Sequence, residues 1–301
     1  MSEVLPLRGR GALRDDARMN VAGALVAQIE RIAQTWSLPP IMALHLPVPS
    51  ADGTREGEFC AIELQDGSLG LSFVLFGDQV GETLRTLRED DHRSRLPGTS
   101  ALTLARAYAE RRGAERTLGF AAVNAITRHL FDRAHFEPAP AGDSIGELDL
   151  GPGDHLGMIG LFPPLVSRVL ATGARLTVLE LRADLAGPRE GWGITLDPAV
   201  LAGCNKVLST STVLLNDTLD DILARCRHAE RVALIGPGAS CLPDVLFARG
   251  VTLIGGVWIN DAEGFKRALA RGEPWGRNAT KFAIKREDYP GYERLCELIA
   301  R

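Results

Sequence analysis

The first regular pattern along the chain is helical. Between residues 17 and 36, apolar side chains recur at intervals of three or four, at Val21, Leu25, Ile29 and Ile32. Apolar residues at this spacing share one face of a helix, and the Pro39-Pro40 pair that follows cannot continue it. The pattern therefore predicts an amphipathic helix over 17–36 that ends before the prolines.

Strand patterns and then further helical patterns fill the rest of the first half. Strand-forming runs lie at 41–46, 59–65 and 69–76, and helical spacing returns at 82–89, 101–112 and 115–131. The second and third runs are joined through Asp66-Gly67, a frequent tight-turn pair, which predicts a hairpin. Strands followed by helices predict an α+β unit with helices packed on one face of an antiparallel sheet.

The pattern changes after a segment rich in proline and glycine at 137–154, which we interpret as a linker. Beyond it, short apolar runs alternate with stretches that can form helices. The runs are 156–161, 176–181, 206–209, 232–235 and 251–254, and the helical stretches are 164–172, 219–226 and 243–249. This alternation predicts a Rossmann-like, doubly wound parallel sheet covered on both faces.

In such a sheet, ligands bind beyond the carboxyl ends of the strands. The first strand runs into Gly160-Leu161-Phe162-Pro163-Pro164, which is not the G-x-G-x-x-G fingerprint of ordinary NAD binding. Gly160, Phe162 and Pro163 either form an anion-binding helix start or a plain strand-to-helix turn. Glu180 follows Gly160 by about 20 residues, where Rossmann proteins place a ribose-binding acid. It could equally be a solvated acid.

Hydroxyl and amide side chains crowd the end of the third strand of this sheet. Ten residues contain six of them, and the candidates for binding are Thr210, Ser211, Asn216 and Thr218. A helix cap accounts for Asp217 or Thr218. The remaining donors and acceptors exceed what a cap requires, so a ligand-binding role is expected for this cluster.

Two further places hold candidate binding residues. The fourth strand ends in Gly236-Pro237-Gly238-Ala239-Ser240, where free N–H groups and Ser240 could hold an oxyanion, or where Gly236 and Pro237 simply form a turn. In the first half, Asn124 stands in an apolar helical pattern. A buried amide needs hydrogen-bond partners, so Asn124 is expected either to bridge structural elements or to face a cleft between the two parts.

Composition narrows the classes of function. The net charge of −4 offers no basic excess, so a general nucleic-acid binder is excluded. No apolar run is long enough to cross a membrane, and residues 1–18 do not read as a secretory signal, so a cytoplasmic location is expected.

The five cysteines and six histidines are scattered without metal-binding spacing, so we assign no protein-only metal site. Cys241 is expected to be an inert thiol.

The strand-end motifs resemble a known family when taken in order. They are Gly157–Val166, Leu179-Glu180, Ser211–Thr218 and Leu234–Ser240, preceded in the first half by Gly70-Leu71-Ser72, Gly98–Leu104 and Gly119–Ala125. The chain resembles the DUF364 proteins, a family named for heavy-metal chelation, together with their usual N-terminal partner, a DUF4213 domain. The resemblance implies an enolase-N-terminal-like α+β domain at residues 1–140 and a Rossmann-like ligand-binding domain at 141–301, with a cleft between them.

Two hypotheses of function follow. The first is binding or processing of a small polar metabolite or metal chelate in the interdomain cleft, with an organic chelate fitting these residues better than a bare ion. The second is a transferase that uses S-adenosylmethionine or a nucleotide, which rests on Glu180 and the Rossmann-like pattern. A lyase or isomerase with Glu180 as general base is a third, weaker option. A small-molecule ligand is the expected partner, and a homodimer is compatible with the sequence.

Overall fold

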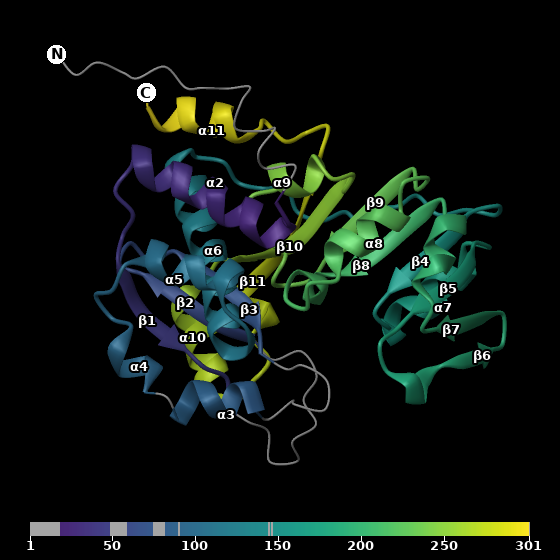
Figure 1. Cartoon of the computed structure of the whole chain (residues 1–301), viewed down its shortest axis with the longest axis horizontal. Coiled ribbons are helices and arrows are strands. Elements are labelled where there is room, and N and C mark those ends of the chain that lie inside the picture. The colour runs from purple at the N-terminus through teal and green to yellow at the C-terminus, as the bar shows by residue number, and fades with distance from the viewer. Residues whose placement is uncertain are drawn as a thin grey trace.

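The computed structural model describes residues 19–48, 59–74, 82–89, 91–143, 145 and 147–300. In these residues a three-stranded antiparallel sheet precedes an eight-stranded sheet along the chain (Figure 1). Three sequence-based expectations lie outside the described residues. They are the lack of a secretory signal in 1–18, the start of the first helix at 17–18, and the end of the third strand at 75–76.

The first half contains the elements that its pattern predicts and one short helix, at 92–95, that it does not. They are α2 (Val21–Thr35), β1 (Ile41–His45), β2 (Phe59–Leu64), β3 (Leu69–Phe73), α3 (Glu82–Glu89), α4 (His92–Arg95), α5 (Ala101–Glu110) and α6 (Gly113–Arg133). The strands pair antiparallel in the order β1-β2-β3. Helix α2 begins after Asn20, whose side-chain oxygen accepts a hydrogen bond from Gly23 N at 2.8 Å. This cap satisfies one of the free N–H groups of the first turn.

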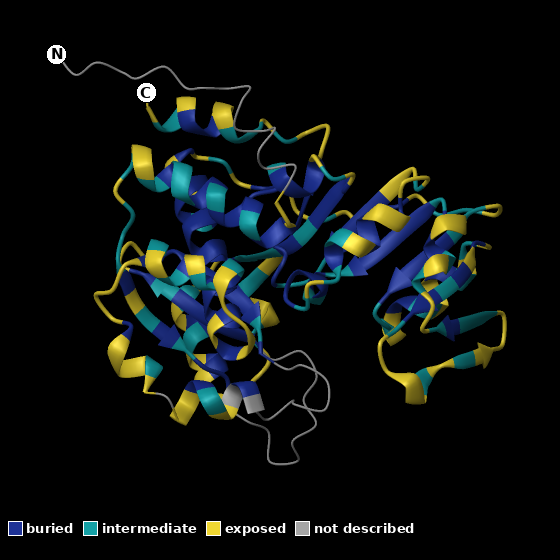
Figure 2. Ribbon diagram, in the orientation of Figure 1, coloured by how far each residue is buried: buried dark blue, intermediate teal, exposed yellow. Residues whose placement is uncertain are grey.

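The three-stranded sheet is buried on both faces, not on one as the sequence predicts. Cys60 and Ile62 share a core with α6, whereas Phe59 and Leu71 pack with Phe265 of α10 (Ala262–Arg271). Side chains alternate between the two faces of a strand, so each strand needs apolar residues at successive positions. The second covering helix comes from the far end of the chain, which local patterns could not reveal (Figure 1). Strands β2 and β3 are buried along most of their length (Figure 2).

The second half forms the predicted doubly wound sheet with three further strands, at 187–189, 192–195 and 279–285, that the pattern does not predict. Its strands are β4 (His155–Ile159), β5 (Arg175–Leu179), β6 (Gly187–Arg189), β7 (Trp192–Thr195), β8 (Lys206–Thr210), β9 (Arg231–Ile235), β10 (Leu253–Ile259) and β11 (Ala279–Lys285). The order is β11-β10-β9-β8-β4-β5-β7-β6, and the strands from β10 to β7 are parallel to their neighbours. The edge strands β11 and β6 are antiparallel.

Helices and short 3-10 turns lie between these strands, and one helix follows the last strand. The helices are α7 (Pro163–Ala171), α8 (Leu219–Arg225), α9 (Asp244–Phe247), α10 and α11 (Tyr292–Ile299), and the turns are η2 (Ala183–Leu185), η3 (Pro198–Gly203), η4 (Ser211–Leu214) and η5 (Gly276–Asn278). Strand β4 lies between β5 and β8, so the strand order reverses there. Such a switch point is where doubly wound sheets bind ligands.

The segment predicted to be a linker is tied to the second sheet. Pro140 forms an isolated antiparallel bridge with Phe282, and Ala141 N donates to Lys281 O at 2.9 Å. The segment therefore extends the edge of the sheet beside β11. The domain boundary at residue 140 remains a prediction from the sequence.

Gly255 and Gly256 lie within β10, although the apolar run at 251–254 predicts a strand that ends before them. A Cβ atom on Gly256 would lie 2.5 Å from Cζ of Phe282 and 2.7 Å from the carbonyl oxygen of Ala239. The glycines therefore permit close packing of β10 against its neighbours and do not end the strand. The chain turns only at Asp261, whose side chain caps α10 by accepting from Gly264 N at 2.8 Å.

Helix α6 approaches β3 so closely that only glycine fits at position 70. A Cβ atom there would overlap the backbone of Ala121 and Ala125. The helix itself is buried around most of its circumference, which explains why its apolar residues do not form a single stripe. The backbone contact at Gly70 therefore sets the distance between the sheet and the most buried helix of the first half.

We expect Gly70→Ala to lower the free energy of unfolding by about 3 kcal/mol, because the added methyl group meets rigid backbone that cannot rotate away. Urea denaturation monitored by circular dichroism measures this loss. Gly151→Ala is the matched control, since a Cβ atom at Gly151 has no neighbour within 4 Å. Equal stability of the two variants would contradict the close contact.

Candidate functional site

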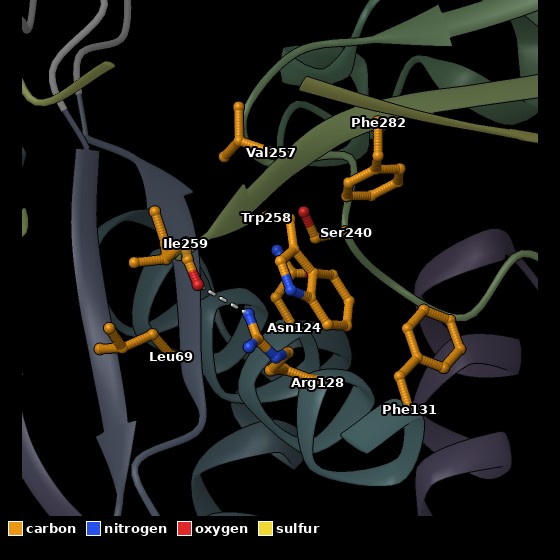
Figure 3. A pocket seen from close by; sticks show the side chains of 9 residues that line it. All are labelled: Leu69, Asn124, Arg128, Phe131, Ser240, Val257, Trp258, Ile259 and Phe282. Carbon is orange, nitrogen blue, oxygen red and sulfur yellow. Dashed lines mark hydrogen bonds between the residues drawn. The ribbon is translucent and has the colours of Figure 1, made fainter. Parts of the chain in front are cut away.

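A small pocket lies where the first sheet and helix α6 meet the second sheet. Its lining residues are Leu69, Asn124, Arg128, Phe131, Ser240, Val257, Trp258, Ile259 and Phe282, and we call it the Asn124 pocket (Figure 3). It lies at the carboxyl ends of β9 and β10, the edge at which parallel sheets bind ligands. Its free volume of about 20 Å³ has room for about one water molecule.

Asn124 bridges the two halves through its amide nitrogen. Nδ2 donates to the carbonyl oxygen of Leu71 in β3 at 2.7 Å and to that of Gly238, after β9, at 3.0 Å. These two bonds fix the orientation of the amide, because the nitrogen must face the two carbonyls. Oδ1 is buried and has no hydrogen-bond partner among the described residues. An unsatisfied buried acceptor is costly, which makes Oδ1 a candidate for binding a ligand's N–H or O–H group.

Arg128 brings a positive charge to the same pocket. Its guanidinium lies 3.7 Å from the centre of the Trp258 ring, Nη1 donates to Ile259 O at 3.2 Å, and Nε donates to both carboxylate oxygens of Asp132. Burial raises the pKa of Asp132, and Arg128 acts against that rise. Within the described part of the chain, Nη2 makes no hydrogen bond. Stacking on Trp258 holds the guanidinium in place while leaving donors for an anion.

The loops after β8 and β9 meet beside Asn124. Gly236 has a φ of 142°, and a Cβ atom there would overlap Oγ of Ser211. Ser240 Oγ donates to the carbonyl oxygen of Pro237 at 3.3 Å. Four of the residues proposed from the sequence thus come from two adjacent loops, and Ser240 among them lines the pocket with Asn124.

A second set of proposed residues lies at the switch point. A Cβ atom on Gly160, whose φ is 79°, would lie 2.9 Å from Cγ2 of Thr210, so the ends of β4 and β8 are in contact. Neither residue lines the Asn124 pocket. Thr210 Oγ1 also accepts from Thr212 N at 3.3 Å and caps η4. The structure therefore brings these two residues together, in a packing and capping contact.

Glu180 is engaged by the backbone. Its Oε2 accepts from Leu161 N at 3.0 Å and its Oε1 from Leu181 N at 2.7 Å. Phe162 is the N-cap of α7, and Pro163 and Pro164 start the helix without N–H donors. The carboxylate thus stabilises the turn after β4, and the start of α7 has few donors left for an anion. Ribose binding by Glu180, and with it the adenosyl or nucleotide alternative, remains a prediction.

The Asn216-x-Thr218 motif forms a local turn. Thr218 Oγ1 donates to Asn216 Oδ1 at 2.6 Å, and Thr218 N donates to the same oxygen at 3.3 Å. An asparagine side chain that accepts bonds two residues ahead stabilises the backbone turn before a helix, here α8. These contacts give both residues a structural role, and their proposed role in ligand binding is untested.

The loop that carries this motif is held by the first half of the chain. Tyr108 donates from its hydroxyl to Leu214 O at 2.7 Å, and Nη2 of Arg116 contacts Asp217 Oδ1 at 2.6 Å. Arg112 also pairs with Asp217. Arg116 is buried and stacks over the Tyr108 ring, and burial raises the pKa of the Tyr108 hydroxyl. We call this contact the Arg116–Asp217 clamp.

Direct metal coordination does not fit the described residues. They contain no group of three or more His, Cys, Asp or Glu side chains placed to hold a metal ion. All five cysteines are buried, and burial raises the thiol pKa to about 12 for Cys60, Cys226 and Cys241 and to about 11 for Cys204. Burial therefore keeps these thiols protonated. The charge of Arg128 further disfavours a bare cation in the Asn124 pocket.

Sequence reasoning missed Arg128 and Trp258. Arg128 follows Asn124 by one helical turn, so both lie on the same face of α6, and this spacing could have identified it. Trp258 lies near the end of β10, which the sequence predicted to stop earlier.

Among the described residues, no helix is long and apolar enough to cross a membrane.

Comparisons with known proteins agree with this architecture. Residues 143–287 match the model of the DUF364 family and residues 57–127 that of the DUF4213 family, both described as "Putative heavy-metal chelation". "Uncharacterized protein MJ0500" of Methanocaldococcus jannaschii is 30% identical over 152 residues, which are 50% of this chain and 56% of that protein. The match thus spans little more than half of the relative's length.

Two solved structures are similar over most of this chain. A DUF364 protein of unknown function from Pyrococcus horikoshii has a TM-score of 0.64 at 22% identity, covering 87% of this chain and 99% of its own. A second, from Desulfitobacterium hafniense, has a TM-score of 0.63 at 21% identity, covering 93% of this chain and 100% of its own. At these identities the similarity concerns the fold.

We expect Asp217→Asn to lower the free energy of unfolding by about 2–3 kcal/mol, because it leaves the buried Arg116 guanidinium without a counter-charge. The estimate lies at the low end for a broken buried pair, since 35% of the Asp217 side chain is exposed. Asparagine tolerates the left-handed backbone at this position, where φ is 58°. Urea denaturation measures the change. Glu297→Ala, which breaks an exposed pair with Arg294, is the control, and an equal effect would contradict the clamp.

Proposed function

The chain contains a DUF4213 and a DUF364 domain, both described as "Putative heavy-metal chelation", and on that premise we propose that it binds a small polar metabolite or metal chelate in the Asn124 pocket. The observation that carries the proposal is the buried Oδ1 of Asn124, which lacks a hydrogen-bond partner although both of its amide protons are used. A ligand with an N–H or O–H group would satisfy this oxygen.

The other walls of the pocket favour an anionic organic ligand. Arg128 supplies a positive charge and free donors, Ser240 a hydroxyl, and Trp258, Phe131 and Phe282 apolar surfaces. A metal held by an organic chelator would present the chelator's carboxylates to Arg128, so the protein needs no ligands of its own for the metal. This combination supports a chelate as cargo better than a bare ion.

Ligand entry requires the walls of the pocket to separate. The free volume of about 20 Å³ is far below the roughly 300 Å³ or more of typical metabolite sites. Opening would move the loop after β9 away from α6 and release the bond from Asn124 to Gly238. The ligand would then replace that bond, which couples binding to a small displacement of the two halves.

The test compares the native mass of the purified full chain with its denatured mass. We expect the native mass to exceed the denatured mass by the mass of an organic molecule or its metal chelate. In Arg128→Met we expect this excess mass to disappear, because the variant lacks the charge that holds the ligand but keeps most of the apolar stem. Arg133→Met is the matched control, since it removes a charge from the same helix outside the pocket.

Three outcomes decide the proposal. An excess lost in Arg128→Met and kept in Arg133→Met supports it. An excess that persists in Arg128→Met places the ligand elsewhere and overturns it. An excess equal to a single metal ion would also overturn it, because direct coordination would then be required.

A further inference from the structure

A second cavity lies at the other end of the strands of the eight-stranded sheet, away from the Asn124 pocket. It is formed by the loop between α8 and β9, the loop between α9 and β10, and the residue that follows β11, and it has a volume of about 280 Å³. Val232 lies near the start of β9 and Thr252 directly precedes β10. The cavity is therefore at the amino ends of these strands, whereas the Asn124 pocket is at their carboxyl ends.

Arginine dominates the charged lining of this cavity. Arg227, Arg249 and Arg286 line it together with a single acid, Glu230, in a chain whose overall charge is negative. Arg249 is engaged in the fold, because it donates to Val245 O at 3.0 Å and to Met19 O at 2.8 Å and lies 3.6 Å from Asp220. Its charge nevertheless adds to the positive potential of the cavity.

The other two arginines have no acidic partner in the described part of the chain. Arg227 uses only Nε, which donates to Ala224 O at 2.8 Å, and both of its terminal nitrogens remain available. The Arg286 side chain makes no hydrogen bond or ion pair among the described residues, although its backbone N donates to Thr252 O. Glu230 forms no ion pair with either of them. Two guanidinium groups with open donors at one cavity suit an oxyanion.

Part of the remaining lining is apolar, and the strand behind it is firmly held. Leu223, Cys226 and Val232 are buried residues that contribute to it. The hydroxyl of Thr252 donates to Val232 O at 3.1 Å and accepts from Val232 N at 3.0 Å, so it braces the strand and is already satisfied. The volume of about 280 Å³ exceeds what a bare ion needs and approaches the roughly 300 Å³ of small-molecule sites, so a small organic molecule fits the cavity better.

We propose that this cavity is a second ligand site, which binds a small organic anion with its phosphate or carboxylate between Arg227 and Arg286 and its apolar part against Leu223, Cys226 and Val232. The site goes beyond the function proposed above and shares no lining residue with the Asn124 pocket.

Calorimetric titration of the full chain with phenyl phosphate, benzoate and inorganic phosphate tests the proposal. We expect saturable binding of phenyl phosphate or benzoate, weakened about tenfold or more in Arg286→Ala and in Arg227→Ala, because each substitution removes charge-assisted hydrogen bonds. Tighter binding of phenyl phosphate would indicate a phosphate ligand, and tighter binding of benzoate a carboxylate. Chemical-shift changes at the amides of Gly250 and Thr252 would locate the ligand.

One control variant and a second set of amide shifts separate this site from other effects. Arg271→Ala removes an exposed charge at the end of α10 and should leave the affinity unchanged. Binding in the Asn124 pocket would instead shift the amides of Trp258 and Ile259, so failure of that pocket and failure of this site are distinguishable. The proposal is overturned if neither aromatic anion binds, if both cavity variants bind as the unsubstituted chain does, or if inorganic phosphate binds as tightly as phenyl phosphate.

Discussion

The architecture depends on the burial of one helix, α6, between two sheets. Gly70 lets the helix backbone touch β3, and Asn124 on the same helix reaches the loop after β9. A buried amide is stable only where its partners are in place, so this side chain requires both halves to hold their relative position. The Arg116–Asp217 clamp, which starts nearer the beginning of α6, requires the loop after β8 to keep its position as well.

These contacts place polar groups where a parallel sheet already favours ligands. The carboxyl ends of β9 and β10 would form an open edge in an isolated doubly wound sheet. Here α6 closes that edge and adds a guanidinium and an amide, while Trp258 provides the surface on which Arg128 rests. The candidate site is therefore a joint product of the two halves, and neither would present it alone.

Local patterns predicted most elements because their causes are local, as with the helical spacing of α2 and the alternation of short strands and helices after residue 155. They missed β6, β7 and β11, which lie at the two sides of the second sheet and have mixed composition, and the short helices α4 and α11. They also missed α10, the second helix covering β1 to β3, which is distant in sequence. Asn124 and Ser240 could be selected as polar residues in unusual settings. Their proximity to Trp258 depends on tertiary packing, which no spacing along the chain encodes.

The cover that α10 gives to the first sheet has a consequence for biosynthesis. A ribosome releases β1 to β3 before it has made most of the second sheet, and α10 emerges only after β10. Until then Phe59 and Leu71 lack the helix that buries them in the finished protein. The N-terminal part therefore cannot complete its core while the rest of the chain is still being translated, as N-terminal domains usually do. The nascent chain exposes an apolar surface of the kind that chaperones shield.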